Sequence, residues 1–226
     1  MGYDVTFHPF SRVDFDYFVD RVLLNPVEYS EQVQRIHDDT GEREYVAREL
    51  YGKWAEFNER ILNGEDFGNT LGFSITGILG YLKPYWYSRG GMLSRLITHE
   101  AFSPCTGDLS TIASQANRAL CSRNEAVITG NYSSGCYIPF EQMRILRSRL
   151  EDEQHAPLIE EAIGEMNIAA LKSCVEYCMQ NELDLLESSD LYSPGSGRCS
   201  TFPKNIRAAY LKNIDDFSND SRARRE

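Results

Sequence analysis

A long uncharged segment constrains this fold more than any other part of the sequence. No Asp, Glu, Lys or Arg occurs between Phe67 and Lys83, and Leu71–Met92 is the most apolar and aromatic stretch of the chain. The segment is shorter than the roughly 20 consecutive apolar residues that a helix needs to cross a bilayer. We therefore expect it to be buried, with a central core helix over Leu71–Leu82 that ends before Pro84.

Four aromatic side chains surround the end of this predicted helix: Tyr81, Tyr85, Trp86 and Tyr87. They either line the core or anchor a protein partner, because aromatic residues are enriched in both places. Stacking on nucleic-acid bases is disfavoured, since Lys83 and Arg89 are the only basic residues among them. We favour the core and keep the interface as the alternative.

The chain is strongly acidic. It has 34 Asp plus Glu against 23 Lys plus Arg in 226 residues, which gives a formal net charge of -11. Such a charge repels phosphate backbones and anionic lipids, so we expect neither nucleic-acid nor membrane binding. It attracts basic proteins, and a basic protein is the partner that the composition favours. The oligomeric state is left open.

Cysteine usage and the N-terminal residues favour a cytoplasmic protein. The six cysteines are scattered without a C-x-x-C pair, which is typical of reduced thiols rather than of a disulfide framework. The first residues lack a basic patch followed by an apolar run, so we predict no signal peptide.

Hydrophobic spacing predicts a mainly α fold: a single multi-helix globular domain with a small β-sheet or hairpin. The strongest helical stripe recurs at steps of three or four residues: Val46, Leu50, Trp54, Phe57 and Ile61. Alternation over Tyr3–His8 predicts a strand ended by Pro9, and apolar runs within 126–138 predict a hairpin. We expect roughly eight helices around Leu71–Leu82, one domain over residues 1–217 and a frayed polar tail over 218–226.

Several helix boundaries follow from capping signals. Ser11 with Asp14 predicts a capping box that opens a helix. We expect this helix to bear its apolar residues together: Val13, Tyr17, Phe18 and Val22. Asn25–Pro26 predicts the start of a second helix. Pro157 opens the longest predicted helix, whose apolar stripe runs to Cys178, and we expect its continuation through Leu183 and Leu186 to break near Asn181.

A basic stripe lies on the helix that we expect after Pro139. It consists of Arg144, Arg147 and Arg149. We interpret it as an ion-paired surface that adds little stability. The alternative is a phosphate-binding site.

Few motifs carry catalytic or metal chemistry. Cys174 and Cys178 share a helical face, but their apolar stripe favours core packing over metal binding. We predict no metal site and no cofactor. A nucleophile is best placed at Ser134 or Cys136, in a glycine-containing loop beside a predicted strand, with a histidine as base.

The most concentrated acidic field with an aromatic neighbour follows the long helix: Glu182, Asp184, Glu187, Asp190 and Tyr192. Such a surface would steer a basic protein towards a tyrosine anchor. We therefore predict an acidic cytosolic protein-binding or inhibitor protein, on the pattern of a bacterial immunity protein that occludes a basic toxin. The alternatives are a small hydrolase or transferase with a Cys136- or Ser134-centred site, and a structural scaffold subunit. A non-catalytic role is favoured.

Overall fold

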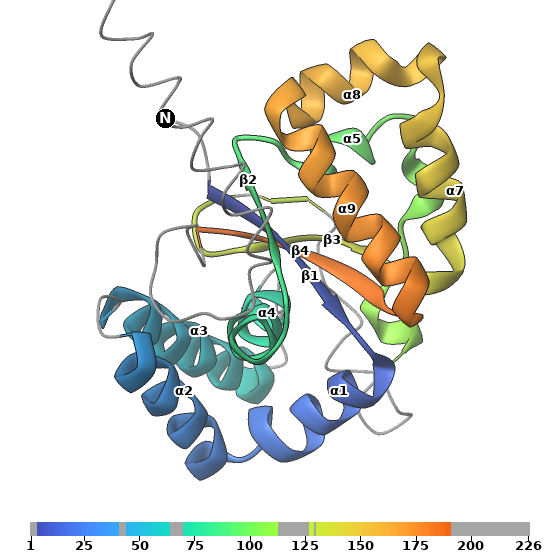
Figure 1. The fold of residues 1–226 in the computed structure, drawn as a ribbon. Coiled ribbons are helices and arrows are strands. Elements are labelled where there is room, and N and C mark those ends of the chain that lie inside the picture. Colours follow the sequence, from blue (N-terminus) through green and yellow to red (C-terminus); the bar gives the residue numbers. More distant parts are fainter. Residues whose placement is uncertain (1–3, 41–43, 64–69, 113–126, 129, 191–226) are drawn as a thin grey trace, which may run out of the picture.

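The computed structural model describes residues 4–40, 44–63, 70–112, 127–128 and 130–190. A four-stranded antiparallel sheet, in the order β2-β1-β4-β3, lies between two layers of helices (Figure 1). The strands are β1 (Asp4–Phe10), β2 (Trp86–Arg89), β3 (Ser134–Ile138) and β4 (Asp184–Ser189). The predicted combination of many helices with a small β element is confirmed.

One helical layer is built from the first part of the chain. It contains α1 (Arg12–Tyr17), the π-helix η1 (Phe18–Leu23), α2 (Pro26–Thr40), α3 (Glu44–Asn63) and α4 (Thr70–Leu82). In this layer α4 packs directly on β1, β3 and β4. Thr76 of α4 donates a hydrogen bond of 2.9 Å to the Ser188 hydroxyl of β4.

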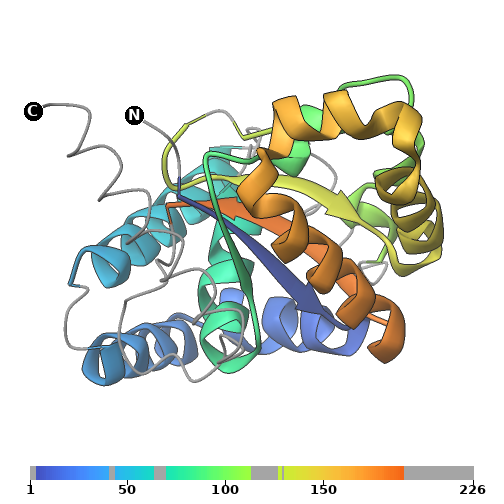
Figure 2. The ribbon, with the colours of Figure 1, turned by 45° about the horizontal axis from the view of Figure 1, so that its top comes forward.

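The other layer covers the opposite face of the sheet (Figure 2). It contains α5 (Leu93–Leu96), α7 (Phe140–Glu151), α8 (Ala156–Ile163) and α9 (Glu165–Asn181). Three short 3₁₀ turns complete the described elements: η2 (Ser103–Cys105), η3 (Leu109–Thr111) and η4 (Glu153–His155). The side chain of Asn167 in α9 bonds both backbone polar groups of Arg89, each at 3.1 Å, on the edge strand β2.

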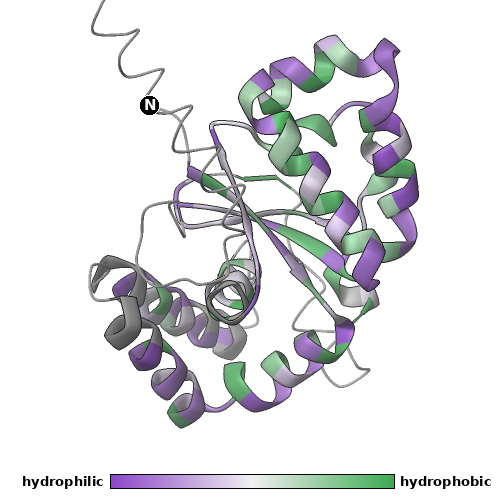
Figure 3. Cartoon of the chain, viewed as in Figure 1, coloured by the Kyte–Doolittle hydropathy of each residue, from purple (hydrophilic) through white to green (hydrophobic). Residues whose placement is uncertain are grey.

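Strand side chains alternate between two hydrophobic cores. Val5 and Phe7 of β1 belong to the core on the α9 side, whereas Phe10 belongs to the core on the α4 side. On β4, Leu185 faces α9 and its neighbour Leu186 faces α4. A sheet buried on both faces contributes about 1.5–3 kcal/mol for each such side chain. Along the helices, hydrophobic and hydrophilic residues alternate as expected where one face is buried (Figure 3).

The predicted central helix is confirmed as α4, whose described apolar residues Phe73, Ile75 and Ile78 are buried. α3 crosses it closely, because Gly77 faces the Leu50 side chain with no room for a Cβ atom. Trp54 of α3 is only partly buried, and its indole N–H donates to the Leu23 carbonyl at 3.1 Å. The side chains of Phe57 and Ile61 lie outside the described residues.

The aromatic cluster belongs to the core where it is described. Tyr85, Trp86 and Tyr87 are at most 2% exposed, and the last two lie in β2. The interface alternative is therefore wrong for these three residues. The side chain of Tyr81 lies outside the described residues.

Pro9 does not end the first strand. β1 continues to Phe10, and Pro9 pairs in register with Leu185 of β4. β2 stops opposite Phe7, so at Pro9 the strand has a partner on one side only, where proline is tolerated.

The predicted hairpin within 126–138 is also wrong. β3 pairs with β4, and neither Val127 nor Ile128 lies in a strand. Ala126, Thr129 and the predicted tail 218–226 lie outside the described residues.

The long helix predicted from Pro157 is three elements. Gly164, with φ +78°, separates α8 from α9, and Glu182 ends α9 in a left-handed conformation. The chain then enters β4, so Leu186 lies on a strand. No helix in the described part of the chain combines the length and the apolar character that crossing a bilayer requires.

Candidate protein-docking surface

The predicted acidic surface is not assembled as expected. Asp184 is 2% exposed and Glu187 is fully buried, because β4 runs between β1 and β3 in the middle of the sheet. Glu182 is exposed at the end of α9, Asp190 is half-buried and Tyr192 lies outside the described residues. Asp184 and Glu187 therefore cannot contact a docked protein, and the predicted cluster does not form a continuous charged surface.

Asp184 has a structural role. Its carboxylate accepts the Phe140 N–H at 2.7 Å at the start of α7 and the Tyr137 hydroxyl at 2.9 Å. Pro139 provides no side-chain cap for α7, so Asp184 satisfies a terminal N–H that the helix itself leaves open. Burial raises the pKa of this carboxyl group despite these bonds.

Glu187 is bound by backbone amides on the α9 side of the sheet. Its two carboxylate oxygens accept N–H groups of Leu93 at 2.6 Å, Ser94 at 2.9 Å and Cys136 at 3.4 Å. Burial nevertheless raises the pKa of Glu187 to about 7. A Cβ atom on Gly135 would lie 2.1 Å from a Glu187 oxygen, so the carboxyl group needs glycine at that position.

The nucleophile predicted at Ser134 or Cys136 is not exposed. Both residues are fully buried in β3. Burial, and then the charge of Glu187, raise the pKa of the Cys136 thiol well above its ordinary value. His8 lies on the opposite, α4 side of the sheet, where it stacks on Tyr85. This environment favours the protonated thiol of Cys136 over the reactive thiolate, so it does not support Cys136 as a nucleophile.

The described cysteines are all free and buried: Cys105, Cys136, Cys174 and Cys178. Cys174 and Cys178 belong to α9 and their side chains lie in the core, as predicted from their apolar stripe. In the described residues, no three His, Cys, Asp or Glu side chains are grouped so as to hold a metal ion.

The exposed apolar residues are concentrated on one segment. Among the side chains that the structure describes, four of the seven large apolar ones with high exposure lie within 15 consecutive residues: Val13 (77% exposed), Tyr17 (54%), Leu24 (46%) and Val27 (67%). We call these four residues the docking row. Single exposed apolar residues are normal, but four within one short segment make that segment a candidate site of interaction.

Local structure explains why this row points outward. α1 and η1 bury another set of side chains: Phe15, Phe18, Val19, Val22 and Leu23. Leu24 follows two buried residues and closes the π-helix, with its N–H donating to the Val19 carbonyl at 3.3 Å. π-helical turns occur frequently at functional sites.

The helix caps in this segment follow the sequence, whereas the apolar face does not. Ser11 and Asp14 form the predicted capping box, and Asn25 accepts N–H groups at the start of α2. Val13 and Tyr17 are exposed instead of sharing a buried face with Phe18. The buried residues of this segment include Phe15 instead.

Carboxylates surround the docking row. Asp16, Asp20, Glu28 and Glu31 lie on the same segment, together with the exposed Arg21. Arg12 pairs with Glu141 and Lys83 pairs with Asp14, whereas Arg35 of α2 bonds the Gln32 side chain. The rim of the row therefore carries a net negative charge.

The class that these observations define is a mainly α protein with a small antiparallel sheet between its helical layers. Comparison of the chain with protein-family models, with curated proteins and with solved structures yields no match.

Proposed function

We propose that this chain is a protein-binding protein whose docking row receives a basic partner. The single observation that carries the proposal is the row of exposed apolar side chains, Val13 to Val27, set among carboxylates. Tyr17 would be the central anchor, because tyrosine supplies a rigid, amphipathic contact at low cost in conformational entropy.

Charge complementarity supports a basic occupant. The acidic rim and the net charge of -11 would accelerate encounter with a cationic surface. The same charge opposes pairing of two copies of this chain through the row. We therefore expect a monomer at micromolar concentration in sedimentation experiments, and a dimer that the Tyr17→Glu substitution dissociates would contradict the proposal.

A pull-down from the cell of origin tests the proposal when it compares variants. Tyr17→Glu combined with Val27→Glu keeps the row exposed but removes its apolar character. Met166→Glu is the matched control, since Met166 is 50% exposed on the other helical layer. Such surface substitutions usually change stability by less than about 0.5 kcal/mol.

The expected result is a basic protein that wild type and Met166→Glu retain and that the double variant loses. Its retention should weaken as salt rises through about 0.15 M, where charges are screened beyond roughly 8 Å. Equal retention by all three proteins would contradict the proposal. The narrower hypothesis of a toxin inhibitor stays a prediction, and the identity of a captured partner would test it.

A further inference from the structure

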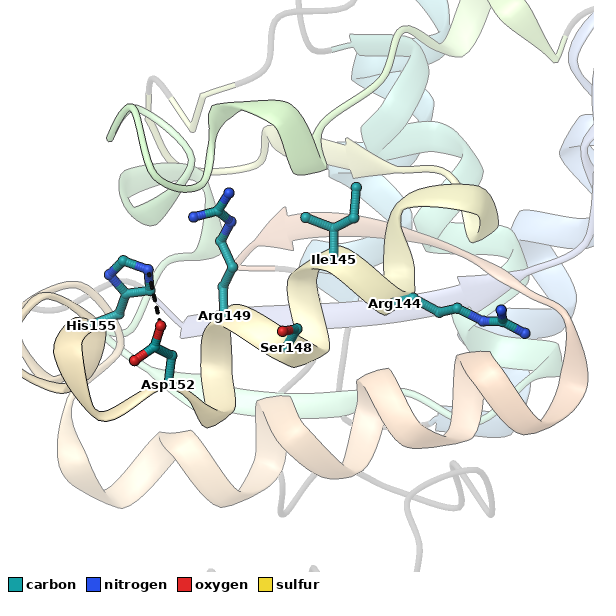
Figure 4. A pocket seen from close by; sticks show the side chains of 6 residues that line it. All are labelled: Arg144, Ile145, Ser148, Arg149, Asp152 and His155. Atoms are coloured by element: carbon teal, nitrogen blue, oxygen red, sulfur yellow. Dashed lines mark ion pairs between the residues drawn. The ribbon is translucent and has the colours of Figure 1, made fainter.

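A pocket of about 320 Å³ lies on the outer side of α7 and the turn that follows it (Figure 4). Its lining residues are Arg144, Ile145, Ser148, Arg149, Asp152 and His155. The pocket is on the helical layer opposite the docking row, so it is a separate site. Its volume is at the lower end of the range for small-molecule sites.

The structure divides the three predicted arginines into two kinds. Arg147 pairs with Glu151 at 3.0 Å and with Glu176 at 3.3 Å, so its charge is balanced within the protein. Arg144 and Arg149 form no ion pair within the described residues. The interpretation of an ion-paired surface therefore holds for Arg147 alone.

The guanidinium of Arg149 also has a donor that lacks a hydrogen-bond acceptor within the described residues. Its Nε atom is buried, yet no described group accepts its hydrogen bond. A buried donor without a partner is costly in a folded protein, and such a group commonly marks a missing ligand or ion. In a chain of net charge -11, two unbalanced arginines at one pocket are unexpected.

The remaining lining residues add hydrogen-bonding groups and an apolar surface. Ser148, which precedes Arg149 on α7, offers a hydroxyl, and His155 offers an imidazole. Ile145 is 39% exposed and provides an apolar wall. Asp152 is the one acidic group lining the pocket, but it accepts the Gln154 N–H at 2.9 Å and lies 3.9 Å from His155 Nε2.

We propose that this pocket binds a small phosphorylated molecule. A phosphate monoester presents several oxygens that arginines recognise through charge-assisted hydrogen bonds. The phosphate would contact Arg149 and satisfy its guanidinium, while the organic part would lie on Ile145 and extend towards Arg144. A carboxylate would use fewer of these donors.

Phenyl phosphate is a suitable probe, because it combines a phosphate dianion with a small apolar group. Binding of phenyl phosphate and of inorganic phosphate to the full chain is followed by ³¹P NMR titration at constant ionic strength, and benzoate is measured as a competitor that displaces bound phenyl phosphate. We expect saturable binding of phenyl phosphate, weaker binding of inorganic phosphate and the weakest binding of benzoate.

Three variants locate the site. Arg149→Gln should weaken phenyl phosphate binding by about tenfold or more, the loss expected for a charge-assisted contact, and Arg144→Gln should weaken it several-fold. Arg147→Gln, on the same helix but ion-paired away from the pocket, is the matched control and should bind within about twofold of wild type. An unchanged urea midpoint would show that each variant remains folded.

The proposal is overturned if wild type shows no saturable binding. It is equally overturned if Arg147→Gln loses as much affinity as Arg149→Gln, because binding would then reflect diffuse charge on α7.

Discussion

Two buried titratable side chains lie on opposite faces of the central sheet. Glu187 faces α5, where burial raises its pKa to about 7. His8 lies on the α4 side, where its Nε2 atom shares a hydrogen bond of 2.7 Å with the Thr6 hydroxyl. Burial lowers the pKa of His8 to about 3. In both cases the fold favours the neutral form, so the two residues shape stability at different ends of the pH range.

The sign for Glu187 follows from its raised pKa. In the unfolded chain the carboxyl group ionises near its ordinary value of 4.5, whereas in the folded protein it keeps its proton until about pH 7. Its contribution to stability is therefore fully present below pH 4.5 and is lost as pH rises to about 7. For His8 the direction is opposite, since the unfolded imidazole protonates below about 6.5 and stability falls as pH decreases from there.

Glu187→Gln should remove the first effect. The amide cannot ionise, so the free energy of unfolding of the variant relative to wild type should improve between pH 5 and pH 8, by on the order of 3 kcal/mol at most. Any fixed cost of placing an amide beside the backbone N–H groups cancels in this comparison. Urea unfolding of both proteins at the two pH values measures it. A difference that stays constant with pH would show that Glu187 does not carry the shift.

Among the secondary-structure elements, β4 is one that local sequence patterns do not predict. The core helix α4 and the starts of α1 and α2 were predictable, because capping residues and apolar spacing are local signals. β4 contains Asp184 and Glu187, which look like exposed charges in the sequence. They are buried because amides of α5, β3 and α7 bind them, and these are distant partners that no local pattern reveals.

The docking row was missed for a related reason. Val13 and Tyr17 have the spacing of a buried helical face, but Phe15 is buried in the core and these two residues are exposed. The choice between two apolar stripes depends on what α1 packs against, and the sequence alone does not give that information.

Two glycine substitutions test how closely the elements pack. Gly91→Ala should destabilise the protein by about 1–3 kcal/mol, because its Cβ would lie 2.0 Å from the backbone oxygen of Ile163 at the end of α8. Gly52→Ala is the control with the opposite sign. Gly52 is in α3 with open space around it, so alanine should stabilise the helix by about 0.5–1 kcal/mol. If both variants shift the urea midpoint in the same direction, the contact between Gly91 and α8 is misplaced.

Trp54→Ala tests the contact between α3 and the π-helix. The indole stacks on Tyr29 with ring centroids 5.3 Å apart and donates to the Leu23 carbonyl. We expect a loss of about 2–4 kcal/mol in urea unfolding, somewhat less than for a fully buried tryptophan. A loss below about 1 kcal/mol would show that Trp54 is a surface residue.

At the scale of the whole molecule, the two helical layers present different surfaces. The layer from α1 to α4 carries the docking row within an acidic rim, whereas α7 on the other layer carries the pocket with two unbalanced arginines. The sheet between them is buried on both faces, so it separates the two surfaces without contributing to either. We therefore propose that one face receives a basic protein and the other an anionic ligand.

Photo-crosslinking from a single position tests whether the docking row contacts a basic protein. A photoreactive phenylalanine analogue replaces Tyr17 in one protein and Met166 in a second, and each is illuminated in the cell of origin. We expect position 17 to capture a basic protein, identified by mass spectrometry, and excess unmodified chain to prevent this capture. We expect no capture of that protein from position 166. Capture from position 166 alone, or capture of a second copy of this chain from position 17, would contradict the proposal.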